Sequence, residues 1–475
     1  MDHKEHQLDF FFYPKSVAII GASSDPKKAG NALVKNFLDY GFKGQIFPIN
    51  PKASEILGLK AYPSLKEVPI DIDLAVFALP AKIVARAIDE CPTKNVKAVI
   101  VHSFGFAESG QEGKAYQDKL VSVARANNMR VVGPNCQGVM CTESRVPWSR
   151  RSTFPQEIGG VSIISQSGGG GGSLVNLAYE RGVKFNKIVT IGNECDASVM
   201  DFIKYFGEDD RTKIIFLYLE GFKDGERILD VVKPLSIHKP IIAYKIGRTA
   251  AGAKAAASHT GSLAGSIEVY DGIFRQTGVL RAKSIDDGLD FLVAFENIWF
   301  GQKRPDGYRV GIVSGPGGPG VATADACVEE GLEVPQISAE SQDRLNEAIP
   351  GATASNPMDM GDFSFVAKLR EEGPYSLMVR IMHDDPIIDI VVIMGPGEFN
   401  PEGFRDEILN IKNFCSKPFI VIWPSAGGTV EACKRELRKS NIALFDTQER
   451  GARALGMLKI YNSYRSRIKE DLHGR

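Results

Sequence analysis

Short apolar runs followed by glycine-rich loops recur along this chain about every 150 residues, the size of one ordinary domain. The runs at residues 17–20, 161–164 and 310–313 are too short for helices, and each leads through a loop into an amphipathic stretch. This succession of strand, loop and helix is typical of doubly wound domains. The pattern therefore predicts three of them.

Other apolar runs alternate with helical stretches inside each interval, which predicts the α/β class with parallel sheets and right-handed crossovers. Polar or Pro/Gly-punctuated segments suggest domains at residues 1–145, 146–300 and 301–475. Ligands of such sheets bind at the carboxyl ends of the strands, where the glycine loops lie. The further strands are expected at residues 45–50, 73–79, 98–102, 130–132, 187–191, 214–219, 241–245, 389–394 and 418–423.

Composition narrows the class of protein. Of 475 residues, 43% are hydrophobic and 24% charged, and the net charge of -1 predicts no nucleic-acid or anionic-membrane partner. No apolar run is long enough to span a bilayer, and the polar N-terminus lacks the core of a secretory signal. The seven cysteines are scattered without a CxxC pair, which favours reduced thiols and a cytoplasmic location.

The first loop, from Gly21 to Gly30, opens a helix whose backbone N–H groups could hold phosphates. Its spacing is not GxGxxG, and the second strand ends in Asn50 and not in an acidic residue, so a dinucleotide is disfavoured. Lys27 and Lys28 suit a phosphate-rich ligand such as CoA. A purely structural βα turn with solvated lysines is the competing interpretation.

The second interval contains His259 among small residues, where a side chain is poorly placed for packing and large ligands can approach. The loop at residues 165–172 opens a helix whose N-terminus favours an anion. Glu220 follows an apolar run, and a carboxylate at a strand end could orient an imidazole so that its other nitrogen acts as nucleophile. An incidental loop histidine and a solvated acid remain the alternatives.

These motifs resemble the NDP-forming acyl-CoA synthetases, relatives of succinyl-CoA synthetase, and most of all the α subunits of archaeal-type ADP-forming acetyl-CoA synthetases. The resemblance covers nearly the whole chain and implies one Rossmann-like CoA-binding domain and two flavodoxin-like ligase domains. The motifs that carry it are Ser165-Gln166-Ser167-Gly168, Gly192-Asn193, Tyr218-Leu219-Glu220-Gly221, Ser258-His259-Thr260-Gly261 and Ser355-Asn356-Pro357-Met358-Asp359.

The resemblance also implies roles. His259 would be the phosphorylated histidine, and Glu220 the glutamate that stabilises it. Phosphate binding would fall to Ser165, Gln166, Ser167, Gly168 and Gly169, and CoA binding to Gly21, Ser23, Lys28, Asn50, Pro80 and Asn135.

The implied reaction interconverts a carboxylic acid, CoA and ATP with acyl-CoA, ADP and phosphate through an acyl phosphate and phosphohistidine. None of the three intervals reads as an ATP-grasp domain, and no Walker motif follows Gly315. We therefore expect ATP, ADP and Mg²⁺ to come with an ATP-grasp β subunit, in a heterotetramer of two α and two β subunits. No metal ligand is assigned to this chain.

Two local features could bear on the acid. The five-glycine run includes Gly170, whose missing side chain would widen an acyl pocket. Arg145, Arg150 and Arg151 could bind a second anionic group on the acid, although a solvated linker is the simpler interpretation. The identity of the acid stays open.

Two other functions compete with this prediction. A CoA- or nucleotide-binding regulatory protein would have no need of His259 and Glu220. An NAD-dependent oxidoreductase is disfavoured by the first loop and by Asn50.

Overall fold

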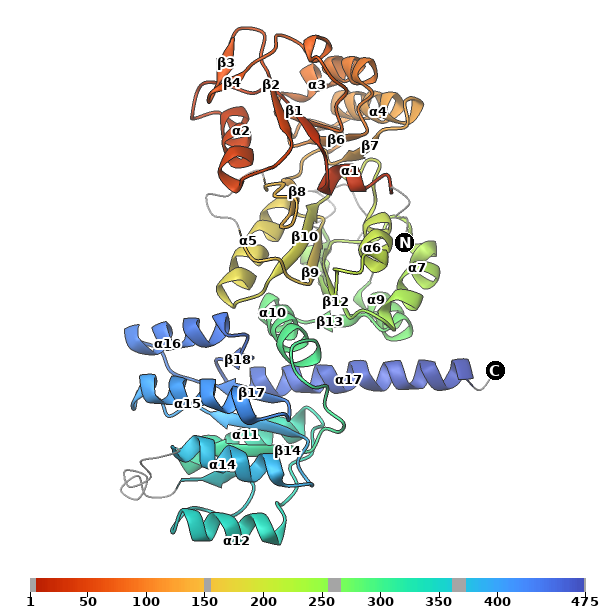
Figure 1. Cartoon of the computed structure of the whole chain (residues 1–475). Coiled ribbons are helices and arrows are strands. Elements are labelled where there is room, and N and C mark those ends of the chain that lie inside the picture. Colours follow the sequence, from red (N-terminus) through yellow and green to blue (C-terminus); the bar gives the residue numbers. More distant parts are fainter. Residues whose placement is uncertain (1–5, 149–154, 255–265, 361–372, 474–475) are drawn as a thin grey trace. The chain divides into compact units, whose positions relative to one another are not determined.

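The computed structural model describes residues 6–148, 155–254, 266–360 and 373–473 (Figure 1). The chain divides into two compact units, Met1–Asn176 with Lys184–Ala282 and Leu177–Val183 with Lys283–Arg475. Three main sheets lie within them. No helix in the part so described combines the length and apolarity needed to cross a bilayer.

The first sheet consists of five parallel strands whose residues are almost all buried, which explains their continuous apolar runs. Its strands are β1 (Ser16–Ile20), β2 (Gln45–Ile49), β5 (Leu74–Phe77), β6 (Ala98–Val101) and β7 (Arg130–Val132), in the order β2-β1-β5-β6-β7. A hairpin of β3 (Glu55–Ile56) and β4 (Leu59–Lys60) follows β2. Helix α2 (Ala29–Tyr40) covers one face, and α3 (Ala81–Ala87) and α4 (Gln111–Ala126) cover the other (Figure 1).

The second sheet has the order β13-β12-β11-β9-β10-β8 and belongs to the same unit. Only its edge strand β8 runs antiparallel, against β10. The strands are β8 (Gly138–Cys141), β9 (Val161–Ser165), β10 (Phe185–Thr190), β11 (Ile214–Leu219), β12 (Ile241–Lys245) and β13 (Leu280–Ala282). The helices are α5 (Gly168–Glu180), α6 (Val199–Glu208), α7 (Ile228–Ser236) and α9 (Ile267–Thr277).

These two sheets share one hydrophobic core. The N-terminal helix α1 (Asp9–Phe12) precedes the first sheet but packs on α6 of the second, where the Phe12 ring lies 5.5 Å from that of Tyr205 and 6.2 Å from that of Phe202. The loops after β7 and β10 also touch: a Cβ at Gly192 would lie 2.2 Å from the carbonyl oxygen of Pro134. The first unit is thus a single packed body that carries two sheets.

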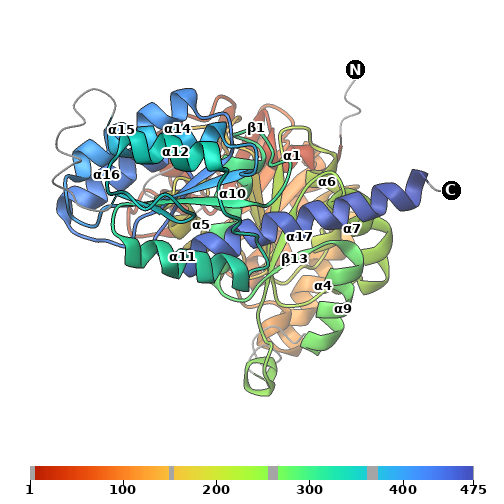
Figure 2. The same cartoon turned by 90° about the horizontal axis from the view of Figure 1, so that it is seen from below.

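The second unit contains the third sheet, of order β15-β14-β16-β17-β18. Its strands are β14 (Val310–Ser314), β15 (Met358–Asp359), β16 (Ile390–Met394), β17 (Phe419–Ile422) and β18 (Leu444–Phe445). Its helices are α10 (Ile285–Ala294), α11 (Gly317–Glu329), α12 (Ala339–Ala348), α14 (Pro374–Asp384), α15 (Pro401–Phe414), α16 (Gly428–Lys439) and α17 (Gln448–His473). The long helix α17 packs against α10 and α11 (Figures 1 and 2), and Arg450 binds Asp290 through both carboxylate oxygens, each at 2.7 Å.

The predicted α/β class with mostly parallel sheets is confirmed, and every predicted strand is present with ends shifted by at most two residues. The strands that the pattern does not predict are β8, β13, β15 and β18, together with the β3–β4 hairpin. They hold two to four residues each, too few to show a period. The division into domains 1–145, 146–300 and 301–475 stays a prediction.

Candidate active site

The second sheet brings together two loops that the sequence singles out. In chain order its central parallel strands are arranged 2-1-3-4-5, so the connections change direction between the neighbours β9 and β11. At such a point, adjacent strand ends open a crevice for ligands. The loop with Ser165, Ser167 and Gly168 follows β9, and Glu220 follows β11. The candidate phosphate loop and the candidate glutamate therefore lie at the carboxyl ends of neighbouring parallel strands.

Helix α5 begins directly after this strand end. The Ser165 hydroxyl donates to the carbonyl oxygen of Ser167 at 2.7 Å, and the Ser167 hydroxyl accepts the Gly170 N–H at 3.1 Å. A Cβ at Gly171 would lie 2.7 Å from the Ser165 hydroxyl oxygen, so glycine lets the helix approach the strand. The first backbone N–H groups of the helix lie beside Gly168 and Gly169, where a phosphate would be stabilised by the helix N-terminus.

Gly170 has a neighbour that the sequence does not reveal. A Cβ at this position would lie 2.6 Å from Cζ of Tyr218, the residue two before Glu220. The Tyr218 ring in turn packs edge-on to Tyr244, with centroids 5.5 Å apart. The Tyr218 ring therefore gives this glycine a packing reason, and a role of Gly170 in an acyl pocket stays a prediction. At Gly169, by contrast, a Cβ would have nothing within 4 Å.

Gln166 binds protein groups with its whole amide. Its Oε1 accepts the N–H groups of Glu220 at 2.6 Å and Gly221 at 3.0 Å. Its Nε2 donates to the Gly221 carbonyl at 2.7 Å and to Oε2 of Glu194 at 3.1 Å. A glutamine amide has two donor hydrogens and two acceptor lone pairs, and all four are used here. In this structure the side chain has no hydrogen-bonding group left over, and phosphate binding by Gln166 stays a prediction.

Glu220 is a buried carboxylate with 9% of its surface exposed. Within the described ranges its carboxylate makes no hydrogen bond and no ion pair. On the next strand Lys245 lies opposite Leu219; burial lowers the pKa of Lys245, and the charge of Glu220 opposes that shift. A carboxylate with so little exposed surface is stabilised by a nearby positive charge or hydrogen-bond donor.

His259 itself, at residues 255–265, lies outside the described residues. The elements before and after that segment, β12 and α9, contact β11 or the loop that follows it. The segment leaves from β12, the neighbour of β11, and α9 follows it. Tyr270 of α9 accepts the Phe222 N–H through its hydroxyl at 3.1 Å, and the Lys245 ammonium lies 4.8 Å from the Tyr270 ring centroid.

The candidate CoA residues meet at the carboxyl edge of the first sheet. Gly21 follows β1 with φ +93°, and a Cβ there would lie 2.7 Å from Cγ of Leu79, so only glycine fits. A Cβ at Gly30 would lie 2.0 Å from the Gly21 carbonyl oxygen, which brings the start of α2 against the loop. Lys28 and Pro80 are exposed at the N-termini of α2 and α3.

Three other predicted CoA residues fix the loops at this edge. Asn50 donates to the Ala22 carbonyl at 2.7 Å and accepts N–H groups of its own loop, while Ser23 accepts the Asp25 N–H at 3.1 Å. Asn135, at φ +58°, donates to Oδ1 of Asn193 at 3.4 Å. The sequence analysis missed Phe104, which is 76% exposed after β6. An apolar side chain so exposed at this edge suits a ligand contact.

Comparison with known proteins places this site in a family. The model of the succinyl-CoA ligase-like flavodoxin domain matches residues 158–295, and that of the CoA binding domain matches residues 15–142. The chain is 37% identical over 454 residues to the α subunit of acetate–CoA ligase [ADP-forming] II from Pyrococcus furiosus, covering 93% of this chain and 95% of that one. The chain belongs to the ADP-forming acyl-CoA ligase family.

Two other family members extend the comparison. Acetate–CoA ligase [ADP-forming] of Methanocaldococcus jannaschii is 38% identical over 474 residues, and this chain covers 65% of its length. The solved structure of acetyl-coenzyme A synthetase 1 from Candidatus Korarchaeum cryptofilum, in complex with phosphate and ADP, matches with a TM-score of 0.88 at 33% identity, covering 98% of this chain and 99% of that one.

Of the arginines proposed to bind the acid, Arg145 lies within the described residues. Arg145 donates to the side chain and carbonyl oxygens of Gln156 at 2.8 and 3.1 Å, and its guanidinium lies 5.2 Å from the Tyr40 ring centroid. Tyr40 ends α2, which runs away from the carboxyl edge of its sheet. That Arg145 binds the acid stays a prediction, and Arg150 and Arg151 lie outside the described residues.

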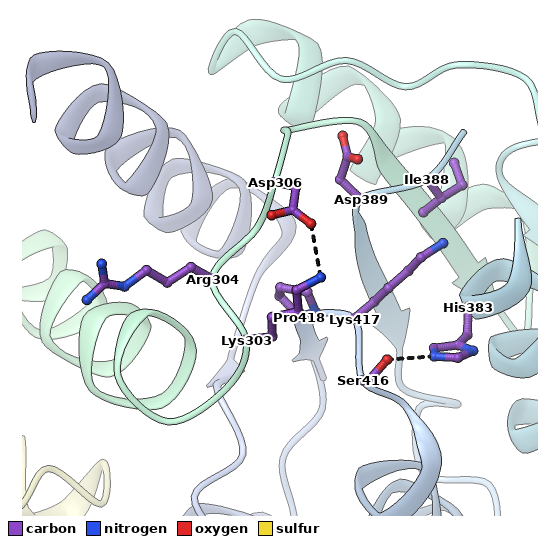
Figure 3. Close-up of a pocket in the computed structure, with 9 residues that line it drawn as sticks. All are labelled: Lys303, Arg304, Asp306, His383, Ile388, Asp389, Ser416, Lys417 and Pro418. Atoms are coloured by element: carbon purple, nitrogen blue, oxygen red, sulfur yellow. Dashed lines mark hydrogen bonds and ion pairs between the residues drawn. The ribbon is translucent and has the colours of Figure 1, made fainter. Parts of the chain in front are cut away.

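A hollow in the second unit lies at the amino ends of the strands of the third sheet, and not at their carboxyl ends. Figure 3 shows it before β16 and β17, where Lys303 pairs with Asp306 at 3.0 Å and Ser416 bonds His383 at 3.0 Å. The Lys417 ammonium donates to the carbonyls of Met382 and Asp385. The polar groups bind one another and do not converge on a ligand. The lining residues are Lys303, Arg304, Asp306, His383, Ile388, Asp389, Ser416, Lys417 and Pro418.

Proposed function

We propose that this chain is the CoA-binding, phosphohistidine-carrying α subunit of an ADP-forming acid–CoA ligase. The observation that carries the proposal is Glu220: a buried carboxylate without a hydrogen bond or ion pair among the described residues, whose backbone N–H is held by Gln166 of the candidate phosphate loop. A non-catalytic CoA-binding protein would gain nothing from burying such a group.

In the direction of acid release, phosphate attacks the thioester carbonyl of acyl-CoA, and the CoA thiolate leaves to give an acyl phosphate. An imidazole nitrogen of His259 then attacks phosphorus, the P–O bond breaks, and the carboxylate leaves with that electron pair. Phosphohistidine passes its phosphoryl group to ADP. Ligation is the reverse, and the covalent relay divides one difficult transfer into easier steps.

The described residues would serve this cycle by position and charge. The N-terminal N–H groups of α5 would bind the transferring phosphoryl group, and Glu220 would accept a hydrogen bond from the other imidazole nitrogen of His259. CoA would lie along the carboxyl edge of the first sheet, with Gly21 allowing close approach and Lys28 near its phosphates. Mg²⁺, when bound with nucleotide, would neutralise charge on the phosphates.

The nucleotide site would belong to a second polypeptide. The Pyrococcus relative is named as an α subunit, and this chain covers 65% of the Methanocaldococcus relative, leaving about a third of that longer protein unmatched. We propose that an ATP-grasp β subunit supplies the equivalent portion here, in an assembly of two α and two β subunits. Each of the three sheets would then form one domain of the α subunit.

Labelling of His259 tests the proposal. The chain is mixed with its ATP-grasp partner, Mg²⁺ and γ-phosphate-labelled ATP, and acid-labile label is counted on wild type and His259→Ala. We expect label on wild type alone, discharged by CoA together with the correct acid. Absence of label on wild type beside a partner that binds ATP would refute catalysis.

CoA binding can be tested separately by thermal unfolding. CoA should raise the Tm of the chain, because a ligand specific to the native state stabilises it, whereas NAD should leave the Tm unchanged. An increase with NAD alone would favour the oxidoreductase alternative instead.

A further inference from the structure

Three strand-end loops around the candidate active site are tied together by one buried polar network. Gln166 follows β9, Glu220 follows β11, and Glu194 lies in the loop after β10; these strands are adjacent, in the order β11-β9-β10. We infer that Gln166 and Glu194 are positioning residues that hold the Glu220 turn in place for phosphoryl transfer. The inference rests on the proposed function of Glu220 and His259.

Gln166 fixes the turn through its backbone. Because Oε1 accepts the N–H groups of both Glu220 and Gly221 while Nε2 donates to the Gly221 carbonyl, three of its four bonds end on this turn. The Gln166 N–H also donates to the carbonyl of Tyr218 at 3.1 Å. The turn therefore cannot shift without breaking several hydrogen bonds to one amide.

Glu194 fixes the amide. It is 7% exposed, and its Oε2 accepts the fourth bond of Gln166 at 3.1 Å. Its Oε1 accepts the Val199 N–H at the start of α6 at 2.6 Å. Since Nε2 of Gln166 must face this carboxylate, Oε1 must face the N–H groups of the turn. Glu194 thus selects the orientation of the glutamine amide in which the turn is held.

Lys223 joins the same loops from the other direction. Its ammonium donates to the carbonyl oxygens of Asn193 at 2.7 Å and Glu194 at 3.1 Å, which connects the loop after β11 to the loop after β10. A polar network in which each donor and acceptor is used is rigid. Rigidity matters here, because a catalytic group must be held within about 0.5 Å of its productive position.

Glu194 acts without reaching the substrate. Its carboxylate is buried behind Gln166 and the first turn of α6, so a change there can affect transfer only through the network. This separates positioning from direct phosphate binding by Gln166. A phosphate ligand would show an effect at residue 166 and none at residue 194.

A swap of the two side chains gives the decisive variants. Gln166→Glu alone places a second carboxylate against Glu194. In Glu194→Gln alone, a single amide oxygen would have to accept hydrogen bonds from both Gln166 Nε2 and the Val199 N–H. In the double variant Q166E/E194Q the glutamine at 194 can accept from Val199 and donate to the glutamate at 166, which restores the link between the loops.

The rate of His259 labelling is measured for the complete enzyme with its partner, together with KM for phosphate, KM for CoA and Tm. We expect each single variant to slow labelling about 10- to 100-fold, as small displacements of catalytic groups do, with both KM values unchanged. The double variant should recover at least part of that rate. The extent to which the double variant recovers the labelling rate measures the interaction between residues 166 and 194.

Three outcomes would overturn the inference. Wild-type rates in Glu194→Gln would show that the link is not needed. A raised KM for phosphate confined to Gln166→Glu would return that residue to phosphate binding. Parallel loss of CoA binding, Tm and rate without rescue would mean a general structural role. An unlabelled wild type would instead refute the proposed function, and this inference with it.

Discussion

The loop after β9 in the first unit and the loop after β14 in the second share one backbone design. Ser165 and Ser314 end their strands fully buried, and each hydroxyl donates to the carbonyl two residues on, at 2.7 Å to Ser167 and 2.6 Å to Pro316. Each strand then leads into a helix of 13 residues, α5 or α11. The turn itself is thus a feature of the fold and not of one reaction.

The side chains placed on this shared turn differ. Gln166, with its four hydrogen bonds, has Gly315 as its counterpart, which has no side chain to join neighbouring loops. Glu220 directly follows its strand and is buried, whereas β16 is followed by Gly395, and Glu398 further along is exposed. The comparison teaches that chemistry on this scaffold is determined by residues at strand ends.

The largest expected effect is on catalysis. Glu220→Gln should slow phosphohistidine formation by about 100-fold or more, because the neutral amide cannot stabilise an imidazole that becomes charged. Glu398→Gln, in the corresponding region of the third sheet, should stay within about twofold of wild type. Labelling rates with the partner subunit measure both. Equal losses would show that the two turns do not differ as described.

Gly170→Ala should destabilise the protein. The new Cβ would lie 2.6 Å from Cζ of Tyr218, and overpacking of this kind costs about 1–3 kcal/mol. Gly169→Ala and Gly318→Ala are matched controls, since a Cβ at either position has nothing within 4 Å. Thermal unfolding should show a lower Tm for Gly170→Ala alone. A Tm equal to that of the controls would contradict the packing of Tyr218.

Replacing either Ser165 or Ser314 by alanine should reduce the stability of the protein by a similar amount. Each hydroxyl makes one buried hydrogen bond of similar length, so Ser165→Ala and Ser314→Ala should each cost about 1 kcal/mol. Calorimetry should show a decrease in Tm of about 2–4 °C for either variant. Only Ser165→Ala should also weaken the use of phosphate. A clear inequality in Tm would mean that the shared turn is not equally supported in the two units.

Two buried loop carboxylates should respond to pH in opposite ways. Burial raises the pKa of Glu194, so the stability that it contributes is present below about pH 4.3 and is lost as the pH rises through the folded-state pKa. Burial alone would also raise the pKa of Asp385, but the N–H groups of Ile387 and Ser338 outweigh it and hold this pKa low. The contribution of Asp385 is present above about pH 3.9 and is lost on further acidification.

Midpoints of urea unfolding, measured from pH 3 to pH 7, test the direction in which each carboxyl group changes stability with pH. Relative to Glu194→Gln, wild type should lose stability as the pH rises. Relative to Asp385→Asn, it should lose stability as the pH falls below about 4. Slopes of the same sign in both pairs would contradict the assigned environments.

The sequence predicts the long central strands because an apolar run such as residues 161–164 is buried on both faces of a parallel sheet. It also predicts that Ser165 and Glu220 both lie at strand ends, where ligands of parallel sheets bind. Short edge strands such as β15 and β18 cannot be predicted in this way. Two residues cannot display a period.

Other parts of the site depend on tertiary contacts that no local pattern encodes. Glu194 lies 28 residues after Gln166 in sequence and reaches it only because its backbone adopts φ +52° in a loop. The contact of Arg145 with Gln156 could not be predicted, because Arg145 follows β8, an antiparallel edge strand that the alternation of elements does not predict. Tyr218 above Gly170 likewise depends on how α5 crosses the sheet.

The single core beneath the first two sheets bears on how such proteins can be recombined. Two family models meet in this unit, yet Phe12 from before the first sheet packs on Phe202 and Tyr205, and Gly192 leaves no gap against Pro134. A chimaera that joined the first sheet of this chain to the second sheet of a relative would place mismatched aromatic rings in the contact between the two sheets. Recombination, whether natural or designed, is therefore expected to give a folded protein when both sheets are exchanged together as one unit.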